Sequence, residues 1–401
     1  MRMASLVFYC GPAAVLLVAA VAGCFWPALL RVWRIPQVLV LPTEKDPGAL
    51  RLGILGASFI ARAAVISAAD KRKDVVVSAV AARDPRRAEA YAAQHQIPFW
   101  HGGPSAYSEL LERQDVDAVY IGLPTGLHLH WSLAAIRAGK DILLEKPAVL
   151  NASEAAQLAQ EAQRTGRQVF EAAHYRYHPA AKRAKQLMST ASKDGGIAPV
   201  RVVEVRFSMF DPKAWFWGRM DLLGLAPTPD RMAERVKNFD RWWYCIDMLI
   251  WSTGATDAKV LSASEGRFSL TAQLKLQVPS TTSGTGDIDA SIVMSRDTIT
   301  EPFTWSLFAA GPSPIPRSST AEASVTLHNF GFPFLWHRLD IKRPGVPTQS
   351  EQLYGDGETT FEHQLGSFGD VVRGTGDYQD TVLLTMATVD RLLAMTEGIL
   401  S

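Results

Sequence analysis

Three side chains that can bind ligands or exchange protons, His128, Lys146 and His174, each come shortly after a short apolar run. Each run predicts a buried β-strand. The carboxyl ends of strands in an open α/β sheet form the edge where ligands bind, so we expect polar groups there to serve a site. An ammonium and two imidazoles could hydrogen-bond a hydroxyl group and take part in proton transfer. The runs are 116–122, 141–144 and 168–171.

A strand expected at 51–55 leads into a small-residue turn and then into the helical pattern 61–71. Glycine allows a tight turn, and a helix N-terminus offers N–H groups to a pyrophosphate. The match to a dinucleotide-binding turn is imperfect, because serine and alanine stand where the second and third glycines are usual. A plain strand–helix turn is the alternative. The residues expected to contact a cofactor here are Gly53, Gly56, Ser58, Phe59, Ile60 and Ala61.

The next expected strand, 75–82, ends at Arg83 and Asp84. An acidic residue at this strand end would bind a ribose hydroxyl, whereas an arginine can pair with the 2′-phosphate of NADP. Arg83, with Arg86 or Arg87 near it, therefore favours NADP, with NAD as the alternative. These arginines could instead only solvate the start of a helix.

Length and composition limit the classes of protein. A chain of 401 residues predicts two domains. The net charge of +1 implies no basic face, so nucleic acid is a poor candidate partner. Three scattered cysteines form neither a disulfide framework nor a metal cluster, and we expect no metal site.

Four motifs resemble the glucose–fructose oxidoreductase/inositol dehydrogenase/rhizopine catabolism family of oxidoreductases, over roughly residues 50–400. The chain looks closest to the NADP-linked D-xylose 1-dehydrogenase and trans-dihydrodiol dehydrogenase branch, on 171–175 and on Arg176 before Pro179. The most specific motif is the Glu-Lys-Pro tripeptide. The motifs are Gly53-Ile54-Leu55-Gly56 with Ile60-Ala61-Arg62, Ile121-Gly122-Leu123-Pro124 with His128, Gly139-Lys140, and Glu145-Lys146-Pro147.

The resemblance implies an α/β plus α+β fold. A Rossmann domain at 50–173 would precede a substrate-binding and oligomerisation domain at 174–401, built on a large, open, mostly antiparallel sheet. The helical stretch 380–400 would pack back on the body, and the open sheet would form a homodimer. Strand-like runs agree with this, at 200–207, 260–270, 272–278, 288–295, 303–308 and 323–327.

The resemblance also implies catalytic roles. Lys146 would lie at the nicotinamide end of the cleft, and Asp240 and Tyr244, four residues apart, would share one face at a helix start. A tyrosine titrates near pH 10, and an adjacent ammonium would lower its pKa. Tyr244 would then exchange the proton while Asp240 anchors substrate. His174 and Arg176 are expected to reach substrate, and the alternative is that they hydrogen-bond loop carbonyls. Further cofactor contacts are expected from Leu123, Pro124, Thr125, His128, Glu145 and Lys146.

The sequence departs from the family where Trp242 replaces a usual glycine. Bulky aromatic residues there would shrink the substrate site or stack against substrate, which makes an aromatic or cyclic substrate plausible. Tyr244 could instead belong to an aromatic core or interface formed with Trp242 and Trp243.

Three functions follow from this pattern. The first is NADP-dependent hydride transfer between the nicotinamide and a carbinol carbon of a sugar or cyclic diol. The second is a tailoring oxidoreductase of secondary metabolism within the same family. The third is a non-catalytic dinucleotide sensor or adaptor, which would need neither Lys146 nor Tyr244.

Residues 3–30 carry no charged side chain. A helix rises about 1.5 Å per residue, so this run could cross a hydrocarbon core of about 30 Å. We expect a membrane anchor or signal segment at 1–35 and a linker at 36–49. Flanking arginines weakly favour a single-pass anchor with the catalytic body in the cytosol. The alternatives are secretion after signal cleavage and a lipoprotein signal ending at Cys24.

Overall fold

The computed structural model describes residues 43–191, 194–209, 231–265, 269–279, 286–295, 303–311, 323–333, 335–355 and 358–397. All the described residues belong to one compact unit. The anchor expected at 1–35 and the first part of the linker lie outside the described residues, so they stay predictions. Within the described ranges, no helix is long and apolar enough to span a bilayer.

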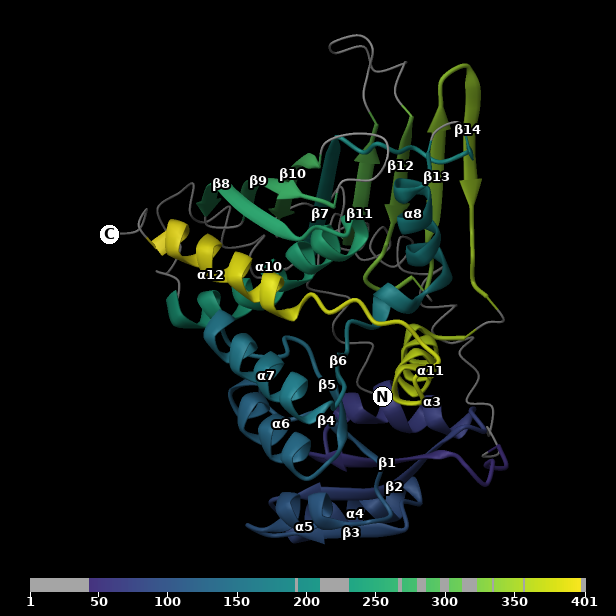
Figure 1. Cartoon of the computed structure of the whole chain (residues 1–401), viewed down its shortest axis with the longest axis vertical. Helices are drawn as coiled ribbons and strands as arrows, with labels where there is room; N and C mark the ends of the chain where they lie inside the picture. The colour runs from purple at the N-terminus through teal and green to yellow at the C-terminus, as the bar shows by residue number, and fades with distance from the viewer. Residues whose placement is uncertain are drawn as a thin grey trace, which may run out of the picture. The chain divides into compact units, whose positions relative to one another are not determined.

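Six parallel strands form the first sheet, in the order β3-β2-β1-β4-β5-β6 (Figure 1). This doubly wound order confirms the expected Rossmann fold. The strand β3 was not predicted, because four residues with little buried surface give no clear pattern. The bounds are β1 (Leu50–Leu55), β2 (Val75–Ala82), β3 (Phe99–Gly102), β4 (Ala118–Ile121), β5 (Asp141–Leu144) and β6 (Val169–Glu171).

Helices cover this sheet, so its central strands are buried throughout. Every residue of β4 and β5 is buried, which is the pattern of parallel strands covered on both faces. A π-helical turn at Arg62–Ile66 continues the first helix. The helices are α2 (Phe59–Ala61), α3 (Ser67–Asp70), α4 (Pro85–His95), α5 (Ala106–Glu112), α6 (His128–Arg137) and α7 (Ala152–Thr165), with a 3₁₀ turn, η2, at Thr125–Leu127.

Eight strands form the second sheet, in the order β14-β13-β12-β11-β7-β10-β9-β8. Only β7 and β10 pair in parallel, so the sheet is mostly antiparallel, as predicted. The bounds are β7 (Val202–Met209), β8 (Asp257–Glu265), β9 (Ser269–Gln277), β10 (Asp287–Ser295), β11 (Phe303–Ala310), β12 (Ser324–His328), β13 (Arg338–Arg343) and β14 (Val346–Glu351).

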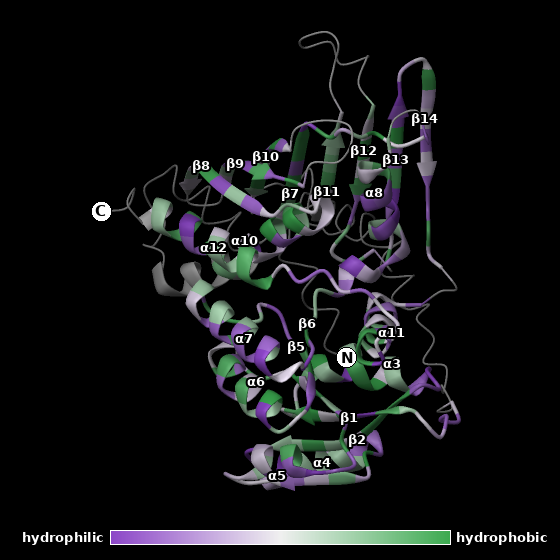
Figure 2. Cartoon of the chain, viewed as in Figure 1, coloured by the Kyte–Doolittle hydropathy of each residue, from purple (hydrophilic) through white to green (hydrophobic). Residues whose placement is uncertain are grey.

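Apolar residues on alternate positions bury one face of the second sheet. Along β9, Leu270, Ala272, Leu274 and Leu276 are buried while their neighbours are more exposed. Hydrophobic and hydrophilic residues also follow one another along β8, as Figure 2 shows. The helices α10 (Arg231–Thr253) and α12 (Val382–Glu397) contact this sheet, and α12 also contacts α7 of the first domain.

Several predicted boundaries were wrong. The run 260–270 was expected to be one strand, but β8 ends at Glu265 and β9 begins at Ser269. The strands β13 and β14 were not predicted, because β14 carries no apolar alternation and is largely exposed. Helix α10 begins at Arg231, so Asp240 and Tyr244 lie well inside it rather than at its start.

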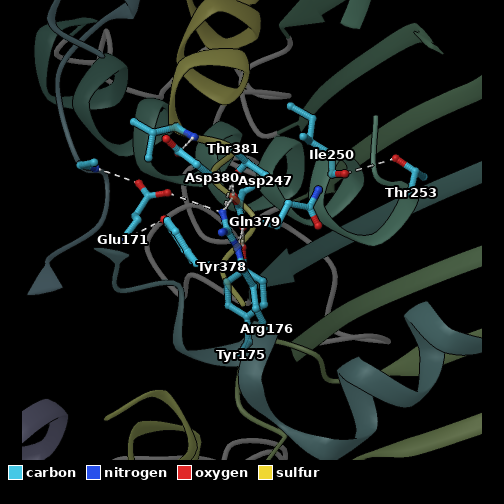
Figure 3. Close-up of polar contacts among 12 residues, drawn as sticks. Glu171, Tyr175, Arg176, Asp247, Ile250, Thr253, Tyr378, Gln379, Asp380 and Thr381 are labelled. Carbon is cyan, nitrogen blue, oxygen red and sulfur yellow. Dashed lines mark hydrogen bonds and ion pairs between the residues drawn. The ribbon is translucent and has the colours of Figure 1, made fainter. Parts of the chain in front are cut away.

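A buried ion-pair cluster joins the end of β6 in the first sheet to α10, which contacts the second sheet (Figure 3). The guanidinium of Arg176, in the 3₁₀ turn η3 (His174–Tyr177), pairs bidentately with Asp247 on α10, and its Nε lies 2.9 Å from Asp247 Oδ2. Its Nη2 also lies 3.6 Å from a carboxylate oxygen of Glu171 and donates to Thr381 Oγ1 at 2.6 Å. The Tyr175 hydroxyl donates to Asp247 as well. These three charged side chains are almost fully buried.

The ionised form of the buried Glu171 carboxyl is stabilised by Arg176. Burial raises the pKa of the Glu171 carboxyl above its ordinary value, while the positive charge of Arg176 acts in the opposite direction. Its other oxygen accepts a hydrogen bond from the Ala148 N–H at 2.9 Å. The ion pair therefore connects the loop after β5 with α10.

We predict that Arg176→Leu lowers the free energy of unfolding by about 3–5 kcal/mol, because it leaves two buried carboxylates without their cation. Arg183→Leu is the matched control. Arg183 pairs with Glu351 at 3.2 Å near the surface, so its loss is expected to cost at most about 1 kcal/mol. Urea unfolding of both variants measures the difference, and equal losses would contradict a dominant role for the buried cluster.

Candidate functional site

The turn after β1 requires glycine at its first position. Gly56 has a φ of +101°, and a Cβ there would lie 2.9 Å from Leu123 Cδ2 and 3.2 Å from the Gly122 carbonyl oxygen. The Ser58 hydroxyl then caps α2 by accepting a hydrogen bond from the Ala61 N–H at 3.3 Å. Sequence and structure therefore agree on a tight strand–turn–helix unit in which serine replaces the second glycine.

Helix α4 braces this turn from the side. The Arg87 guanidinium donates to the Ala57 carbonyl oxygen at 2.6 and 3.1 Å, and the Tyr91 hydroxyl donates to the Ser58 carbonyl oxygen at 2.9 Å. Arg87 and Tyr91 are four residues apart, so they share one face of the helix. The brace satisfies the turn carbonyls and fixes the direction in which helix 59–70 begins.

A cavity of about 420 Å³ lies beside the glycine turn, between the ends of β1, β2 and β4. Arg83 and Arg87 belong to its wall, whereas Asp84 is used as the N-cap of α4 and accepts from the Arg86 and Arg87 N–H groups. The wall therefore suits an anion such as a phosphate. The lining residues are Gly56, Ala57, Ser58, Ala82, Arg83, Asp84, Arg87, Tyr107, Gly122, Leu123, Pro124 and Leu127.

These residues fit a dinucleotide. A Cβ at Gly56 would hinder the close approach of a ligand to the turn. Gly122 is a second position of this kind, because a Cβ there would lie 3.0 Å from Ser58 Oγ. Of the expected cofactor contacts, Gly56, Ser58, Arg83, Leu123 and Pro124 line the cavity. Tyr107 also lines it and was missed by the sequence analysis, because its position on α5 gives no signal of its own.

Other expected cofactor contacts lie outside the cavity wall. Gly53 sits within β1, where a Cβ would come 2.6 Å from Leu110 Cδ2, so it allows α5 to pack on the sheet. Phe59 and Ile60 are exposed at the start of α2, and Ala61 is buried beneath them. Thr125 begins the turn η2.

His128 joins the cavity wall to the loop that carries Lys146. Its Nε2 lies 2.7 Å from the Leu123 carbonyl oxygen, and its Nδ1 lies 3.0 Å from the Pro147 carbonyl oxygen. The ring is buried, and burial lowers the pKa of His128. It was expected to line the cofactor cleft; the structure places it behind the cleft, where it holds two strand-end loops together.

Glu145 is positioned by its neighbours. The buried Tyr120 hydroxyl donates to Glu145 Oε1 at 2.7 Å, and the Lys146 N–H donates to Glu145 Oε2 at 3.2 Å. Burial and the adjacent carboxylate together raise the pKa of Tyr120 well above its ordinary value. Tyr120 therefore acts as a hydrogen-bond donor that fixes the start of the Glu-Lys-Pro loop.

The structure brings Lys146 and Tyr244 together. The Lys146 ammonium nitrogen lies over the Tyr244 ring, 4.4 Å from its centroid. Lys146 is half-buried and Tyr244 is buried. A cation over the ring face stabilises a phenolate more than a phenol, because the phenolate charge extends into the ring.

His174 is linked to this pair through Tyr175, whose ring lies 5.9 Å from the His174 ring and 5.8 Å from the Tyr244 ring. Its Nδ1 is 3.0 Å from Thr360 Oγ1, at the start of helix α11 (Thr360–Val372). The pKa of His174 is lowered to about 3, first by burial and then by the positive charge of Lys146. The imidazole is therefore neutral near pH 7, and in this form it can act as a hydrogen-bonding group.

Two aromatic residues complete this group and were missed. The Trp305 ring of β11 lies 5.1 Å from Tyr244 and 5.2 Å from Phe332, which follows β12. The Phe332 ring lies 6.2 Å from His174. Their sequence neighbourhood contains no motif, so only the pairing of strands could reveal them.

Other expected site residues lie elsewhere. Arg176 was expected to reach substrate, but it is buried and its guanidinium is engaged by Asp247, Glu171 and Thr381. Bulky aromatic residues at Trp242 were expected either to crowd the substrate site or to form an aromatic core with Trp243; both tryptophans are fully buried, which favours the core. The side chain of Asp240 lies outside the described part of the structure, so its role as substrate anchor stays a prediction.

Comparison with known proteins supports the first domain most directly. Residues 50–173 match the family model described as an oxidoreductase family with an NAD-binding Rossmann fold. A D-xylose 1-dehydrogenase (NADP(+)) from Haloferax volcanii is 38% identical over 151 residues, which are 38% of this chain and 45% of that protein. A trans-1,2-dihydrobenzene-1,2-diol dehydrogenase from Oryctolagus cuniculus is 36% identical over 155 residues, or 39% and 44%. The chain thus spans about half the length of the curated relatives it matches.

A similarity of fold extends further. A 3-ketoreductase from Actinomadura kijaniata, solved in complex with NADP and TDP-benzene, superposes with a TM-score of 0.62 over 87% of this chain and 98% of that one, at 21% identity. Other structures of that reductase carry a lysine-to-alanine or a tyrosine-to-phenylalanine substitution. At this level of identity the similarity shows the fold alone, over most of the chain.

His174 predicts a pH dependence of stability. Its pKa is about 3 when folded and about 6.5 in an unfolded chain, so only the unfolded state takes up the proton between these values. We expect its contribution to the free energy of unfolding to be complete above pH 6.5 and to be lost as the pH falls toward 3. His174→Gln should make this decline shallower, as measured by urea unfolding at several pH values.

Thr360→Ala is the control for this experiment. It removes the hydrogen-bond partner of His174 but leaves the imidazole, so it should lower stability without flattening the pH dependence. A His174→Gln variant with the slope of the unmodified protein would show that the ring titrates alike in both states.

Proposed function

We propose that this chain is an NADP-dependent oxidoreductase, because residues 50–173 match the model of the glucose–fructose oxidoreductase/inositol dehydrogenase/rhizopine catabolism family. Its substrate would be a sugar or a cyclic diol, oxidised or reduced at a carbinol carbon. The observation that carries this proposal is the contact of the Lys146 ammonium with the Tyr244 ring, 4.4 Å from its centroid. A protein that only sensed a dinucleotide would need no such pair.

The bound nicotinamide would supply the hydride chemistry, and the chain's own groups would handle the proton. Tyr244 gives or takes the proton of the substrate hydroxyl. The charge of Lys146 favours the phenolate form of Tyr244 and can hold the substrate oxygen. The neutral imidazole of His174 adds a hydrogen-bonding group to the same place.

The cavity supports NADP as the cofactor. Arg83 and Arg87 stand on the wall beside the end of β2, where the 2′-substituent of an adenosine ribose is bound in Rossmann domains. The acidic alternative, Asp84, is already engaged as a helix cap. The dehydrogenase from Haloferax volcanii described above is also named for NADP.

The proteins to which this chain is similar favour two classes of substrate. The xylose and dihydrodiol dehydrogenases favour a simple sugar or a cyclic diol. The second candidate is a tailoring reductase acting on a nucleotide-linked sugar, which the similarity of fold to the ketoreductase favours. Both candidates use the same Lys146 and Tyr244 pair.

We predict that Lys146→Ala and Tyr244→Phe each lower turnover by about 10²–10⁴-fold, because each removes part of the proton-transfer machinery. Turnover would be followed by NADPH absorbance with a panel of aldoses, cyclic diols and keto sugars. Binding of NADPH, followed by its fluorescence, should be retained in both variants.

Lys182→Ala provides a matched control, since Lys182 also lies over a tyrosine ring, 5.9 Å from the centroid of Tyr177, but away from Lys146 and Tyr244. It should keep full turnover. Tight NADPH binding with no turnover of any substrate by the unmodified protein would reject the enzyme in favour of a sensor.

For the cofactor, we predict that Arg83→Ala weakens NADPH binding by about 10- to 100-fold, the range expected for one charge-assisted contact, and leaves NADH binding nearly unchanged. Arg86→Ala is the control, because Arg86 lies in the first turn of α4, three residues after Arg83, and does not line the cavity. Fluorescence titration with both cofactors measures the ratio; an equal loss for NADPH and NADH would contradict recognition of the 2′-phosphate by Arg83.

A further inference from the structure

A buried tyrosine on α5, Tyr107, belongs to the wall of the nucleotide cavity. The residue is 5% exposed, and it lines the cavity together with Arg83 and Arg87. Its ring packs edge-on against Trp131 of α6, with the ring centroids 4.8 Å apart and an interplanar angle of 76°. The side chain is therefore fixed by packing at the edge of a cavity that suits an anion.

The turn after β3 places Tyr107 next to the end of β2. The two strands pair in parallel with Ala82 opposite Gly102, and the Gly103 N–H donates to the Ala82 carbonyl oxygen at 3.3 Å. A Cβ at Gly102 would lie 2.4 Å from Pro85 Cα, so glycine allows this close approach. Helix α5 begins shortly after the turn. Tyr107 thus lies at the strand end where Rossmann domains bind the 2′-substituent of the adenosine ribose.

Arg83 acts directly on the Tyr107 hydroxyl. Burial raises the pKa of the Tyr107 phenol, while the charge and the hydrogen-bonding groups of Arg83 act in the opposite direction. Burial has the larger effect, so the phenol keeps its proton near pH 7. An arginine side chain can only donate hydrogen bonds, and the Tyr107 oxygen is therefore the acceptor in this contact.

The O–H proton of Tyr107 is then available to a ligand. Among the described residues, no hydrogen bond donated by this hydroxyl is found. A tyrosine hydroxyl that is buried usually has a hydrogen-bond partner, because leaving a buried donor unsatisfied costs free energy. An acceptor inside the cavity would satisfy this group while it also pairs with the Arg83 guanidinium.

We propose that the Tyr107 hydroxyl donates a hydrogen bond to the 2′-phosphate of NADP and selects this cofactor together with Arg83. The inference rests on the proposed function and adds a second recognition residue to its cofactor site. A phosphate has three acceptor oxygens and more than one negative charge near pH 7, whereas the 2′-hydroxyl of NAD is neutral. Arg87 directs its Nε and Nη2 to the Ala57 carbonyl oxygen, so fewer of its N–H groups can reach the phosphate.

Tyr107→Phe tests this inference, because it removes the hydroxyl and keeps the ring that packs on Trp131. Fluorescence titration with NADPH and with NADH measures both affinities. We expect NADPH binding to weaken by about 10- to 100-fold, the range for a hydrogen bond to a charged group, and NADH binding to stay nearly unchanged.

Tyr91→Phe is the matched control. The Tyr91 hydroxyl donates to the Ser58 carbonyl oxygen at 2.9 Å in the same turn, but Tyr91 does not line the cavity. Its loss should leave the ratio of the NADPH and NADH affinities unchanged. A Tyr107→Phe variant that keeps the ratio of the unmodified protein, or that loses both cofactors in equal proportion, overturns the inference.

Two probes without a nicotinamide isolate the 2′-phosphate. Adenosine 2′,5′-bisphosphate and adenosine 5′-monophosphate differ only in this group, and titration calorimetry measures their binding to the unmodified protein and to Tyr107→Phe. The bisphosphate should bind the variant about 10- to 100-fold more weakly, and the monophosphate should bind both proteins alike. A bisphosphate affinity that is the same in both proteins also overturns the inference.

These measurements separate the inference from the proposed function. If Tyr107→Phe loses the preference for NADPH but no substrate in the panel is turned over by the unmodified protein, the inference stands and the oxidoreductase proposal fails. If substrates are turned over and Arg83→Ala selectively weakens NADPH binding while Tyr107→Phe does not, the oxidoreductase proposal stands and Tyr107 only packs against Trp131.

Discussion

The buried chain of charges from Glu171 through Arg176 to Asp247 sets the geometry of the site. Glu171 holds the backbone just after Pro147, and Asp247 lies one helical turn after Tyr244 on α10. Arg176 bonds to Asp247 and lies close to Glu171. The relative position of the Lys146 loop and the Tyr244 helix is therefore fixed by charges that cannot separate without leaving a buried ion unpaired. Tyr175 adds a second constraint, since its hydroxyl bonds Asp247 while its ring lies 5.8 Å from Tyr244.

The nucleotide-binding half could be predicted because its chemistry is local in the sequence. The turn at Gly56 is indicated by the strand before it and the helix after it, and Arg83 directly follows a strand that is apolar except for Ser78. Lys146 was found in the same way, at the end of β5. In each case the candidate residue lies within a few positions of the strand or helix that positions it, so one short stretch of sequence indicates both. His128 shows the limit of this reasoning: its place was expected near the cleft, but its two carbonyl partners could not be foreseen.

The second half of the site depends on contacts that no local pattern contains. Trp305 faces Tyr244 because β11 pairs with β7 in one register, which places Trp305 opposite Phe207. Alternation predicts which face of a strand is buried, but it does not say which strand lies beside it. Arg176 illustrates the same difficulty, since an arginine that binds a ligand and one that pairs with a buried carboxylate look alike until the partner on α10 is known. For Trp242 the sequence left two interpretations open, a wall of the substrate site and an aromatic core with Trp243, and only the packing of α10 decides for the core.

The brace between α4 and the glycine turn has a consequence for coenzyme engineering. Arg87 lines the nucleotide cavity and also holds the Ala57 carbonyl oxygen, with Tyr91 acting one helical turn later. A replacement of Arg87 chosen to admit a different dinucleotide would also release the turn on which every dinucleotide must rest. Arg87 thus combines a place on the cavity wall with a structural role at the turn, and a redesign of cofactor preference that starts from Arg83 has to leave Arg87 in place.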